Sequence, residues 1–394
     1  MKRRGNRARS DFVYEIARLI RLVSMLPKFI LFFLTLTVSL RAVPVFIGTS
    51  SGKTSSSRGI YRADFDLATG KLTEPVLAAE YQNPGFLALH PTLPILYACG
   101  QPNTPLPGGV SAVAAFGIGK DHSLKFLAEA SSGGKGACHV AVDGTGRTVA
   151  LSNYGDGTVS TIRLDEYGLP GALASGVAHS GSGPAKPRQD GPHAHGVYFD
   201  KANTHLFVPD LGLDQVFVYP FDAATSKLGK PLPSLVTAPG AGPRHLVFSA
   251  DEKNAYVINE LNCTVLSTTY HAGQFEALGT VPTLPDDFSG INTTAEIEVH
   301  PNGRFVYASN RGHDSIAMFR RDPRNGSLTP MGQAPCGGKV PRHFKIDPSG
   351  KWLLCAHQGS NTISVLALDP ETGLLGPPLG TVSTPSPICL LFQR

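Results

Sequence analysis

Short apolar runs alternate with polar residues along most of the chain, with a period of two residues. Runs of this kind, bounded by Gly, Pro, Asn and Asp, predict β-strands joined by tight turns. Glycine and proline are frequent, with 43 and 32 copies, which disfavours long helices. The pattern therefore predicts an all-β fold.

The pattern is also repeated. Each copy has an apolar strand ending in His-Pro, Asp-Pro or Asp-Gly or in a similar turn, and then a second apolar strand ending in a polar pair. The copies span residues 86–101, 139–154, 196–211, 245–260, 296–311 and 343–358. A third alternating strand, a turn and a fourth stretch follow. Four strands per repeat of about 50 residues are typical of a β-propeller blade.

The two ends of the repeat region complete each other. VPVFIGT (43–49), GIYRADFD (59–66) and a stretch from Leu72 supply the second, third and fourth strands of a blade. Its missing first strand is supplied by PICLLF (387–392). A blade built from both ends closes the ring and removes exposed sheet edges. We therefore predict seven four-stranded blades in one domain, residues 43–394.

The charge of the chain is unevenly distributed. Its formal net charge is +5, but residues 1–42 hold nine of the 35 basic residues and two of the 30 acidic ones. The remainder carries 26 basic and 28 acidic residues, a net charge of −2. Nucleic-acid binding needs a clustered basic face, so we expect no nucleic-acid partner.

Residues 1–42 read as a separate basic segment that ends in an export signal. The apolar run 29–40 is shorter than the roughly 20 residues of a membrane-spanning helix and matches the apolar region of a signal peptide. Lys28 precedes the run, Ala42 is a possible cleavage residue, and Met25 is an alternative start. We predict export to the periplasm or the cell exterior. The alternative is an uncleaved anchor over residues 19–40, the sole membrane contact expected.

The six cysteines lack CxxC spacing. This spacing predicts neither a zinc site nor a disulfide framework, and most of the cysteines are expected to be small buried side chains. Export permits a disulfide without requiring one. No metal and no cofactor are expected.

In a β-propeller the first strand of each blade lines a central channel, and the strands within a blade are antiparallel. The start of each first strand and the end of each second strand therefore lie at the same mouth of the channel. At these positions the repeats carry polar residues. The residue before each first strand (the first position) is Gly85, Cys138, His195, Arg244, Ala295, Arg342 or Pro387. The next residue (the second position) is Phe86, His139, Gly196, His245, Glu296, His343 or Ile388. Second strands end at Thr49–Ser50, Gly100–Gln101, Asn153–Tyr154, Asp210–Leu211, Asn259–Glu260, Asn310–Arg311 and His357–Gln358. Since neighbouring strand residues point to opposite sides, we expect only one of the first two positions to face the channel in any blade.

A ring of Arg, Glu and His suits the capture of a carboxylate or phosphate and the transfer of protons. The residues expected to contact substrate are His139, His193, His245, Asn259, Glu296, Asn310, His343 and His357. The alternative is that such residues stitch the blades together around a water-filled channel. The Pro- and Gly-rich loop 181–195 forms either a rim over the mouth or a plain surface loop. His-Pro at 90–91 and 300–301 recurs at a turn and is expected to be structural.

Several motifs resemble a known family. GPHAH (191–195), GPRH (242–245), INE (258–260), AEIEVHPNGRFVYASNRGHDSIAMF (295–319) and PRHFKIDPSGKWLLCAHQGSNTISV (341–365) resemble the lactonase family of seven-bladed propellers. That family includes propeller-type 6-phosphogluconolactonase and the fungal carboxymuconate cycloisomerase. The resemblance covers nearly all of the chain after residue 43.

The resemblance implies a metal-independent enzyme of carbohydrate metabolism. The four residues proposed to act in the cycloisomerase correspond to His195 (or its neighbour His193), Arg244, Glu260 and Arg311. They imply hydrolysis of a small sugar-derived lactone such as 6-phosphogluconolactone, with either His195 or Glu260 as the general base.

Export changes the substrate that this activity implies. Phosphorylated sugar intermediates stay in the cytoplasm, so a non-phosphorylated aldonolactone or a muconate-like lactone is the alternative substrate of an exported enzyme. The alternative functions are a non-catalytic binding propeller for a ligand or protein and a lactone-forming cycloisomerase. Closed propellers are often monomers, and a monomer is expected.

Overall fold

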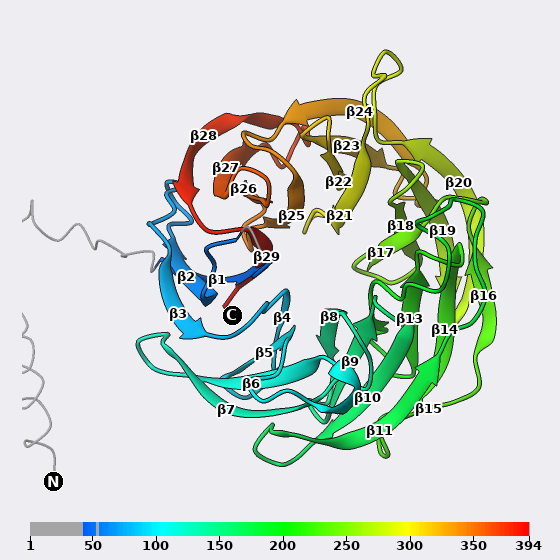
Figure 1. The fold of residues 1–394 in the computed structure, drawn as a ribbon. Coiled ribbons are helices and arrows are strands. Elements are labelled where there is room, and N and C mark those ends of the chain that lie inside the picture. The colour runs from blue at the N-terminus through cyan, green and yellow to red at the C-terminus, as the bar shows by residue number, and fades with distance from the viewer. Residues whose placement is uncertain (1–41, 53–54, 394) are drawn as a thin grey trace, which may run out of the picture. The chain divides into compact units, whose positions relative to one another are not determined.

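The computed structural model describes residues 42–52 and 55–393. These residues form seven antiparallel sheets arranged as blades around a central channel (Figure 1). Six blades have four strands, and the blade that contains β12 to β16 has five. The predicted all-β, seven-bladed propeller is confirmed. The described residues contain one helical turn, η1 (Pro107–Gly109).

The blades are numbered in chain order from the one that contains both ends of the domain. Blade 1 contains β29 (Pro387–Phe392), β1 (Val43–Thr49), β2 (Gly59–Phe65) and β3 (Val76–Glu80). Blade 2 contains β4 (Phe86–Leu89), β5 (Ile95–Gly100), β6 (Ala112–Ile118) and β7 (Leu124–Ser131). Blade 3 contains β8 (Ala137–Val142), β9 (Thr148–Asn153), β10 (Thr158–Leu164) and β11 (Pro170–Ala178). Blade 4 contains β12 (Tyr198–Phe199), β13 (His205–Asp210), β14 (Gln215–Asp222), β15 (Lys227–Leu228) and β16 (Leu232–Val236).

The remaining three blades follow the same order. Blade 5 contains β17 (Pro243–Phe248), β18 (Asn254–Asn259), β19 (Thr264–His271) and β20 (Gln274–Pro282). Blade 6 contains β21 (Thr293–Val299), β22 (Phe305–Arg311), β23 (Ser315–Arg321) and β24 (Leu328–Pro335). Blade 7 contains β25 (Pro341–Ile346), β26 (Trp352–His357), β27 (Thr362–Leu368) and β28 (Leu375–Ser383).

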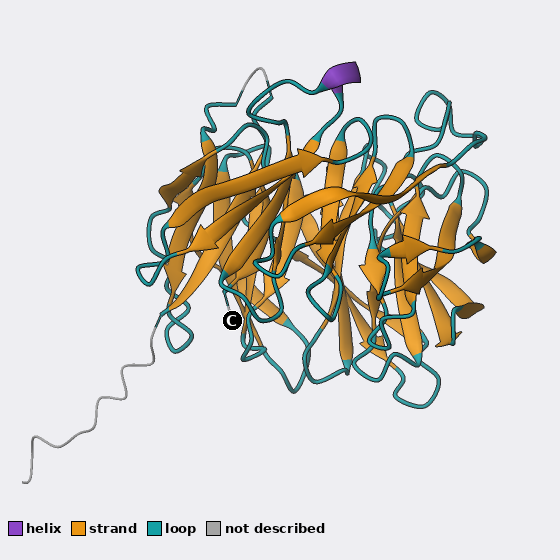
Figure 2. Ribbon diagram, turned by 90° about the horizontal axis from the view of Figure 1, so that it is seen from below, coloured by secondary structure: helices purple, strands orange, loops and turns teal. Residues whose placement is uncertain are grey.

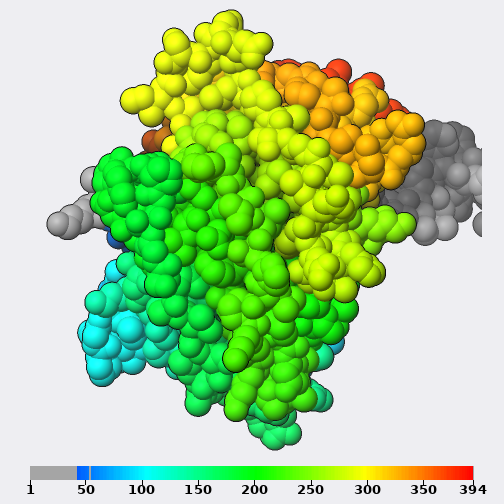
Figure 3. Space-filling view, turned by 90° about the vertical axis from the view of Figure 1, so that its right-hand side faces the viewer, coloured from blue at the N-terminus to red at the C-terminus, as the bar shows by residue number. Residues whose placement is uncertain are grey.

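The ring closes as predicted. β29, the last strand of the chain, pairs antiparallel with β1, so that Val45 lies opposite Phe392 and Ile47 opposite Leu390. β1 also pairs with β2, which places the C-terminal strand innermost in blade 1 (Figure 1). In the space-filling view, the green, yellow and orange parts of the chain follow one another around the ring (Figure 3).

The hydrophobic core lies between blades. Between blades 6 and 7, for example, Phe305 and Tyr307 pack with Phe344 and Leu353, and all four are buried. Burial of a large apolar side chain contributes about 1.5–3 kcal/mol. The alternating apolar residues of each strand therefore bind each blade to its two neighbours.

The His-Pro turns join blades as well. Nε2 of His90 donates to the carbonyl of Gly146 in the next blade at 2.9 Å, and His300 makes the same contact with Gly350 at 2.8 Å. These contacts support the expected structural role. The strands run between two loop-covered faces (Figure 2), and the second strands end at the face that carries η1.

Candidate active site

A pocket of about 500 Å³ lies at one mouth of the channel. Its size is within the range of pockets that enclose small metabolites. The starts of first strands, the ends of second strands and the loop between β11 and β12 build its wall. The lining residues with charged or proton-transferring side chains are Cys138, Tyr154, Arg188, His195, Arg244, Glu260, Arg311 and Arg342.

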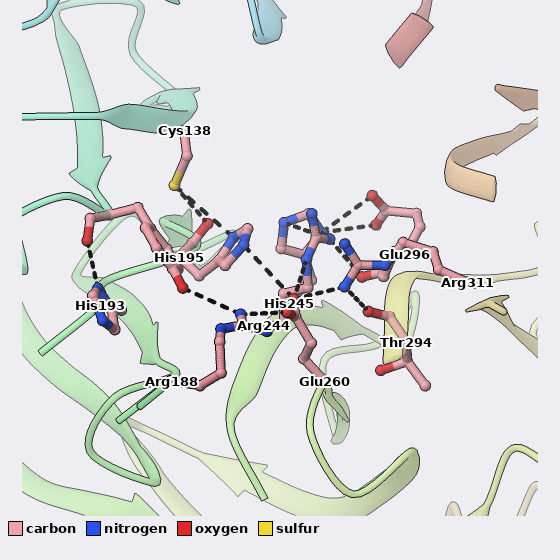
Figure 4. A network of polar contacts seen from close by, with 12 residues as sticks. Cys138, Arg188, His193, His195, Arg244, His245, Glu260, Thr294, Glu296 and Arg311 are labelled. Carbon is pink, nitrogen blue, oxygen red and sulfur yellow. Dashed lines mark hydrogen bonds and ion pairs between the residues drawn. The ribbon is translucent and has the colours of Figure 1, made fainter. Parts of the chain in front are cut away.

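Glu260, directly after β18, is the one carboxylate that lines the pocket. Nη2 of Arg188 donates to its Oε1 at 2.6 Å. Nη2 of Arg311 and Nε of Arg244 lie 2.9 and 3.1 Å from its Oε2 (Figure 4). Burial raises the pKa of Glu260, but the three guanidinium groups outweigh burial and hold that pKa at about 2. Glu260 is therefore ionised at neutral pH and is a weak base.

Backbone carbonyls of blade 6 hold two of these arginines in place, Arg244 from blade 5 and Arg311 from blade 6 itself. Nη1 of Arg244 donates to the carbonyl of Ala295, and Nη2 of Arg311 donates to that of Thr294, each at 2.6 Å. The Nε atoms of both arginines and Oε2 of Glu260 are buried and have no aligned hydrogen-bond partner among the described residues. The Arg244–Glu260 ion pair is thus close in distance but not aligned as a hydrogen bond.

His195 lies beside the carboxylate. Its backbone N–H bonds to the carbonyl of Pro209 at 2.9 Å, and its Nε2 is 3.9 Å from Oε2 of Glu260. The thiol of Cys138 donates to the carbonyl of His195 at 3.4 Å. Burial, and then the charge of Arg244, lower the pKa of His195 well below its usual value. His195 is therefore neutral at neutral pH and can accept a proton.

Arg342, at the start of β25, also lines the pocket. Within residues 42–52 and 55–393 its guanidinium makes no hydrogen bond or ion pair. Burial, and then the charges of Arg244 and Arg311, lower its pKa to about 9. Arg342 occupies the same repeat position as Arg244, and this correspondence is the sequence signal that identifies it.

The loop 181–195 forms a rim of the pocket. Arg188 reaches from it to Glu260 and also donates to the hydroxyl of Tyr154 at 3.2 Å. His193 stacks on Tyr154 with ring centroids 4.3 Å apart, and its Nδ1 lies 2.7 Å from the carbonyl of Tyr154. His193 thus supports a lining residue. Arg188 has no counterpart in the other repeats, so repeat comparison could not identify it.

A second layer of predicted residues lies deeper in the channel. Nδ1 of His245 is 3.1 Å from Oε2 of Glu296, and Nε2 of His343 is 3.4 Å from the same atom. The ring of His139 is 5.3 Å from that of His245 between centroids. His139, Glu296 and His343 line a separate cavity of about 360 Å³. Burial lowers the pKa of all three histidines. They form the floor of the site and do not line its upper pocket.

The expectation that only one of the first two positions faces the channel is wrong for blades 3, 5 and 7. In blade 3, Cys138 lines the pocket and His139 lines the deeper cavity, and the register shifts between Ala137 and His139. Arg244 and Arg342 line the pocket, while the next residues, His245 and His343, also lie in the channel. The strand register shifts at this point, between Pro243 and His245 in blade 5 and at the corresponding position of blade 7. A β-bulge re-aims neighbouring side chains and so overrides the alternation.

Three of the predicted residues form hydrogen bonds to protein groups and do not face the pocket. Nδ2 of Asn259 donates to Oγ1 of Thr264 at 2.9 Å. Nδ2 of Asn310 donates to the carbonyl of Thr283 at 2.9 Å. His357 bonds to Ser364 and is fully buried. None of the three is among the residues that line the pocket. The Asn310 contact joins blade 6 to the linker that follows blade 5, as in the stitching alternative, whereas Asn259 and His357 each bond within their own blade.

Comparison with known proteins identifies the family. The sequence profile described as "Lactonase, 7-bladed beta-propeller" matches residues 44–392. The chain belongs to this lactonase family. The family resemblance in the sequence is thereby confirmed, and the pocket is a feature of a lactonase-family propeller.

The lactonase-family relatives include proteins with named activities. The 6-phosphogluconolactonase of Bacillus subtilis is 35% identical over 351 residues, which cover 88% of this chain and 97% of that protein. The 6-phosphogluconolactonase of Formosa agariphila is 34% identical over 310 residues, covering 77% of this chain and 86% of that protein. The structure of the periplasmic gluconolactonase of Pseudomonas aeruginosa is similar with a TM-score of 0.82 and 28% identity, covering 89% of this chain and 99% of that chain.

The four residues that the lactonase resemblance singled out meet in one place. His195, Arg244 and Arg311 all lie within 4 Å of Glu260. The predicted signal peptide or anchor lies outside the described residues. Among the described residues, no helix is long and apolar enough to cross a membrane.

Proposed function

We propose that this pocket hydrolyses a sugar-derived lactone. The observation that carries the proposal is the neutral, buried His195 beside a carboxylate that three arginines hold ionised. The names of the Bacillus subtilis and Pseudomonas aeruginosa proteins support the same reaction class.

His195 is the general base of the proposed reaction. A base must be unprotonated at the working pH, and the lowered pKa of His195 meets that requirement. Glu260 is also unprotonated, but its pKa of about 2 makes it too weak a base to activate water. Glu260 instead stabilises the positive charge that His195 acquires when it takes the proton, because Oε2 of Glu260 lies 3.9 Å from Nε2 of His195.

The proposed reaction adds one water molecule to the lactone. Water attacks the lactone carbonyl carbon and passes one proton to His195, which leaves a tetrahedral oxyanion. Arg244 and Arg311 stabilise this oxyanion through their guanidinium groups. The ring C–O bond then breaks, and the departing alkoxide takes the proton from His195. The product is an open-chain hydroxy acid, whose carboxyl group releases its proton to solvent.

Arg342 is proposed to bind an anionic substituent of the substrate. The pocket wall carries four guanidinium groups and one carboxylate, and Glu260 contacts three of the four. Arginine binds carboxylates and phosphates through paired hydrogen bonds. A lactone that carries a carboxylate or a phosphate therefore fits this charge distribution.

A substrate panel tests the proposal. Base consumption at constant pH is followed with 6-phosphogluconolactone, gluconolactone and a muconolactone, for the wild type and for His195→Asn, with His271→Ala at an exposed histidine as the control. Hydrolysis of a lactone that depends on His195 supports the proposal. Absence of turnover with every lactone, or formation of lactone from carboxymuconate alone, would instead favour a binding protein or a cycloisomerase.

Export is proposed for this chain on the basis of its first 42 residues. The apolar run 29–40 and the preceding basic residues support an export signal. The structural relative from Pseudomonas aeruginosa is described as periplasmic. N-terminal sequencing of the protein from its native cell fraction tests the proposal. An intact N-terminus in a cytoplasmic fraction would refute export, and an intact N-terminus in a membrane fraction would indicate the anchor.

A further inference from the structure

Three side chains of the types that bind metal ions meet in blade 7 and in the linker that precedes it. Cys336 lies between β24 and β25, and Cys355 and His357 lie on β26. All three are fully buried, and none lines the pocket. Nδ1 of His357 is 3.9 Å from the sulfur of Cys336 and 3.9 Å from the sulfur of Cys355. The three potential ligand atoms lie within 4.8 Å of one another.

A hydrogen-bond chain orients the imidazole toward the two sulfurs. The hydroxyl of Ser364 donates its proton to the carbonyl of Cys336 at 2.6 Å. The same hydroxyl lies 2.9 Å from Nε2 of His357 and therefore accepts the Nε2 proton. Nδ1 of the neutral ring consequently faces the sulfurs with its lone pair. Ligand histidines in metal proteins are commonly fixed through the other ring nitrogen in this way.

The equivalent place in blade 6 shows what the fold alone requires. There Oγ1 of Thr283 donates to Oδ1 of Asn310 at 2.7 Å, and Nδ2 of Asn310 donates to the carbonyl of Thr283 at 2.9 Å. Ala308 lies two residues before Asn310, where blade 7 has a cysteine. A hydroxyl, a methyl and an amide thus suffice to join two blades. Blade 7 has a thiol, a second thiol and an imidazole at these positions.

The two sulfur–nitrogen distances match a planar three-coordinate ion. With metal–sulfur bonds of about 2.3 Å and metal–nitrogen bonds of about 2.0–2.1 Å, sulfur and nitrogen are about 3.5 Å apart in a tetrahedron and about 3.8 Å apart in a trigonal plane. The observed separations are 3.9 Å. Thiolate and imidazole ligands favour Cu(I) and Zn(II), and structural zinc almost always has four ligands.

We propose that Cys336, Cys355 and His357 form a three-coordinate Cu(I) site within blade 7. Binding replaces the thiol protons by the metal and releases them to solvent, with no change in oxidation state. The site lies outside the pocket, and its role is to fasten the linker at Cys336 to β26.

Competition with a chromogenic Cu(I) chelator tests this site on the full-length, reduced protein. We expect about one tightly bound Cu(I) per chain in the wild type. The Cys336→Thr/His357→Asn double variant, which reproduces the residues of blade 6, should lose this binding while keeping its circular-dichroism spectrum. Cys99→Ser, at a buried cysteine of β5, is the matched control and should bind as the wild type does.

X-ray absorption of the copper-loaded wild type provides a test that needs no variant. Two sulfur ligands and one nitrogen ligand are expected. A disulfide between Cys336 and Cys355 in protein from its native source would overturn the proposal. Equal Cu(I) binding by the double variant, or a stronger preference for Zn(II), would also overturn it.

Discussion

Nε2 of His195 lies 3.9 Å from Oε2 of Glu260, and both side chains are almost fully buried. Two of the three guanidinium groups around that carboxylate come from blades 5 and 6, and the third comes from the rim loop. The carboxylate is thereby kept charged and the imidazole uncharged. This division of protonation states supports the proposed roles of His195 as the base and of Glu260 as its electrostatic partner.

Replacement of His195 by Asn should remove the base. General acid–base catalysis contributes about 10²- to 10⁴-fold, so kcat should fall by that factor. KM should change little, because the arginines are retained. Lactone hydrolysis is measured at constant pH and corrected for the spontaneous reaction. An unchanged kcat would contradict the assignment, and His271→Ala should behave like the wild type.

The pH dependence of kcat/KM should show two limits. Acid protonates His195, and because its pKa is lowered, activity should persist below pH 6.5 before it falls. On the alkaline side, Arg342 loses its charge near pH 9, and kcat/KM for an anionic lactone should fall there. Initial rates across the pH range test both limits. Arg342→Gln should lack the alkaline decline, whereas an acid limit above pH 6.5 would argue against a neutral buried imidazole.

Glu260→Gln should reduce both stability and activity. The carboxylate has a pKa of about 2 in the folded protein against 4.5 in its usual state, so it stabilises the folded state above pH 4.5 and loses this effect as pH falls through 2. The effect amounts to about 3 kcal/mol at neutral pH. Urea unfolding should show this loss at neutral pH and a smaller loss near pH 3. Glu276→Gln, at an exposed position, is the control, and a variant as stable as the wild type would refute the electrostatic account.

Arg342→Gln should discriminate between charged and neutral lactones. Hydrogen bonds to charged groups contribute about 1.5–3 kcal/mol, so kcat/KM for an anionic lactone should fall about 10- to 150-fold relative to that for gluconolactone. The ratio of the two values is the measurement, and Arg342→Lys should recover part of it. Arg147→Gln, at an exposed arginine, is the control. An unchanged ratio would show that another residue binds the anion.

The sequence predicted the fold well because the propeller repeats its signals. The blade containing both termini followed from one unmatched strand at each end of the repeat region. The same comparison brought Arg244, Glu260 and Arg311 to one mouth, because antiparallel geometry fixes where strand ends lie. Repetition also aligned Arg342 with Arg244, although only the structure shows that the Arg342 guanidinium has no partner among the described residues.

Features without a counterpart in the repeat could not be predicted. Arg188 lies on a loop that is unique to blade 4, and its reach to Glu260 depends on the path of that loop. The bulges before His245 and His343 break the alternation and leave no clear mark in the sequence. Cys336 and His357 lie 21 residues apart, and no spacing rule for metal ligands covers such a pair.

The position of β29 has a consequence for the biogenesis of the protein. A growing chain lacks the inner strand of blade 1 until β29 has been synthesised, so the edge of β1 that pairs with β29 stays unpaired until then. Arg244, Glu260 and Arg311 are synthesised well before that strand, but the circle that holds them in register closes only with it. The geometry proposed for the site is therefore complete only once residues 387–392 have been added to the chain.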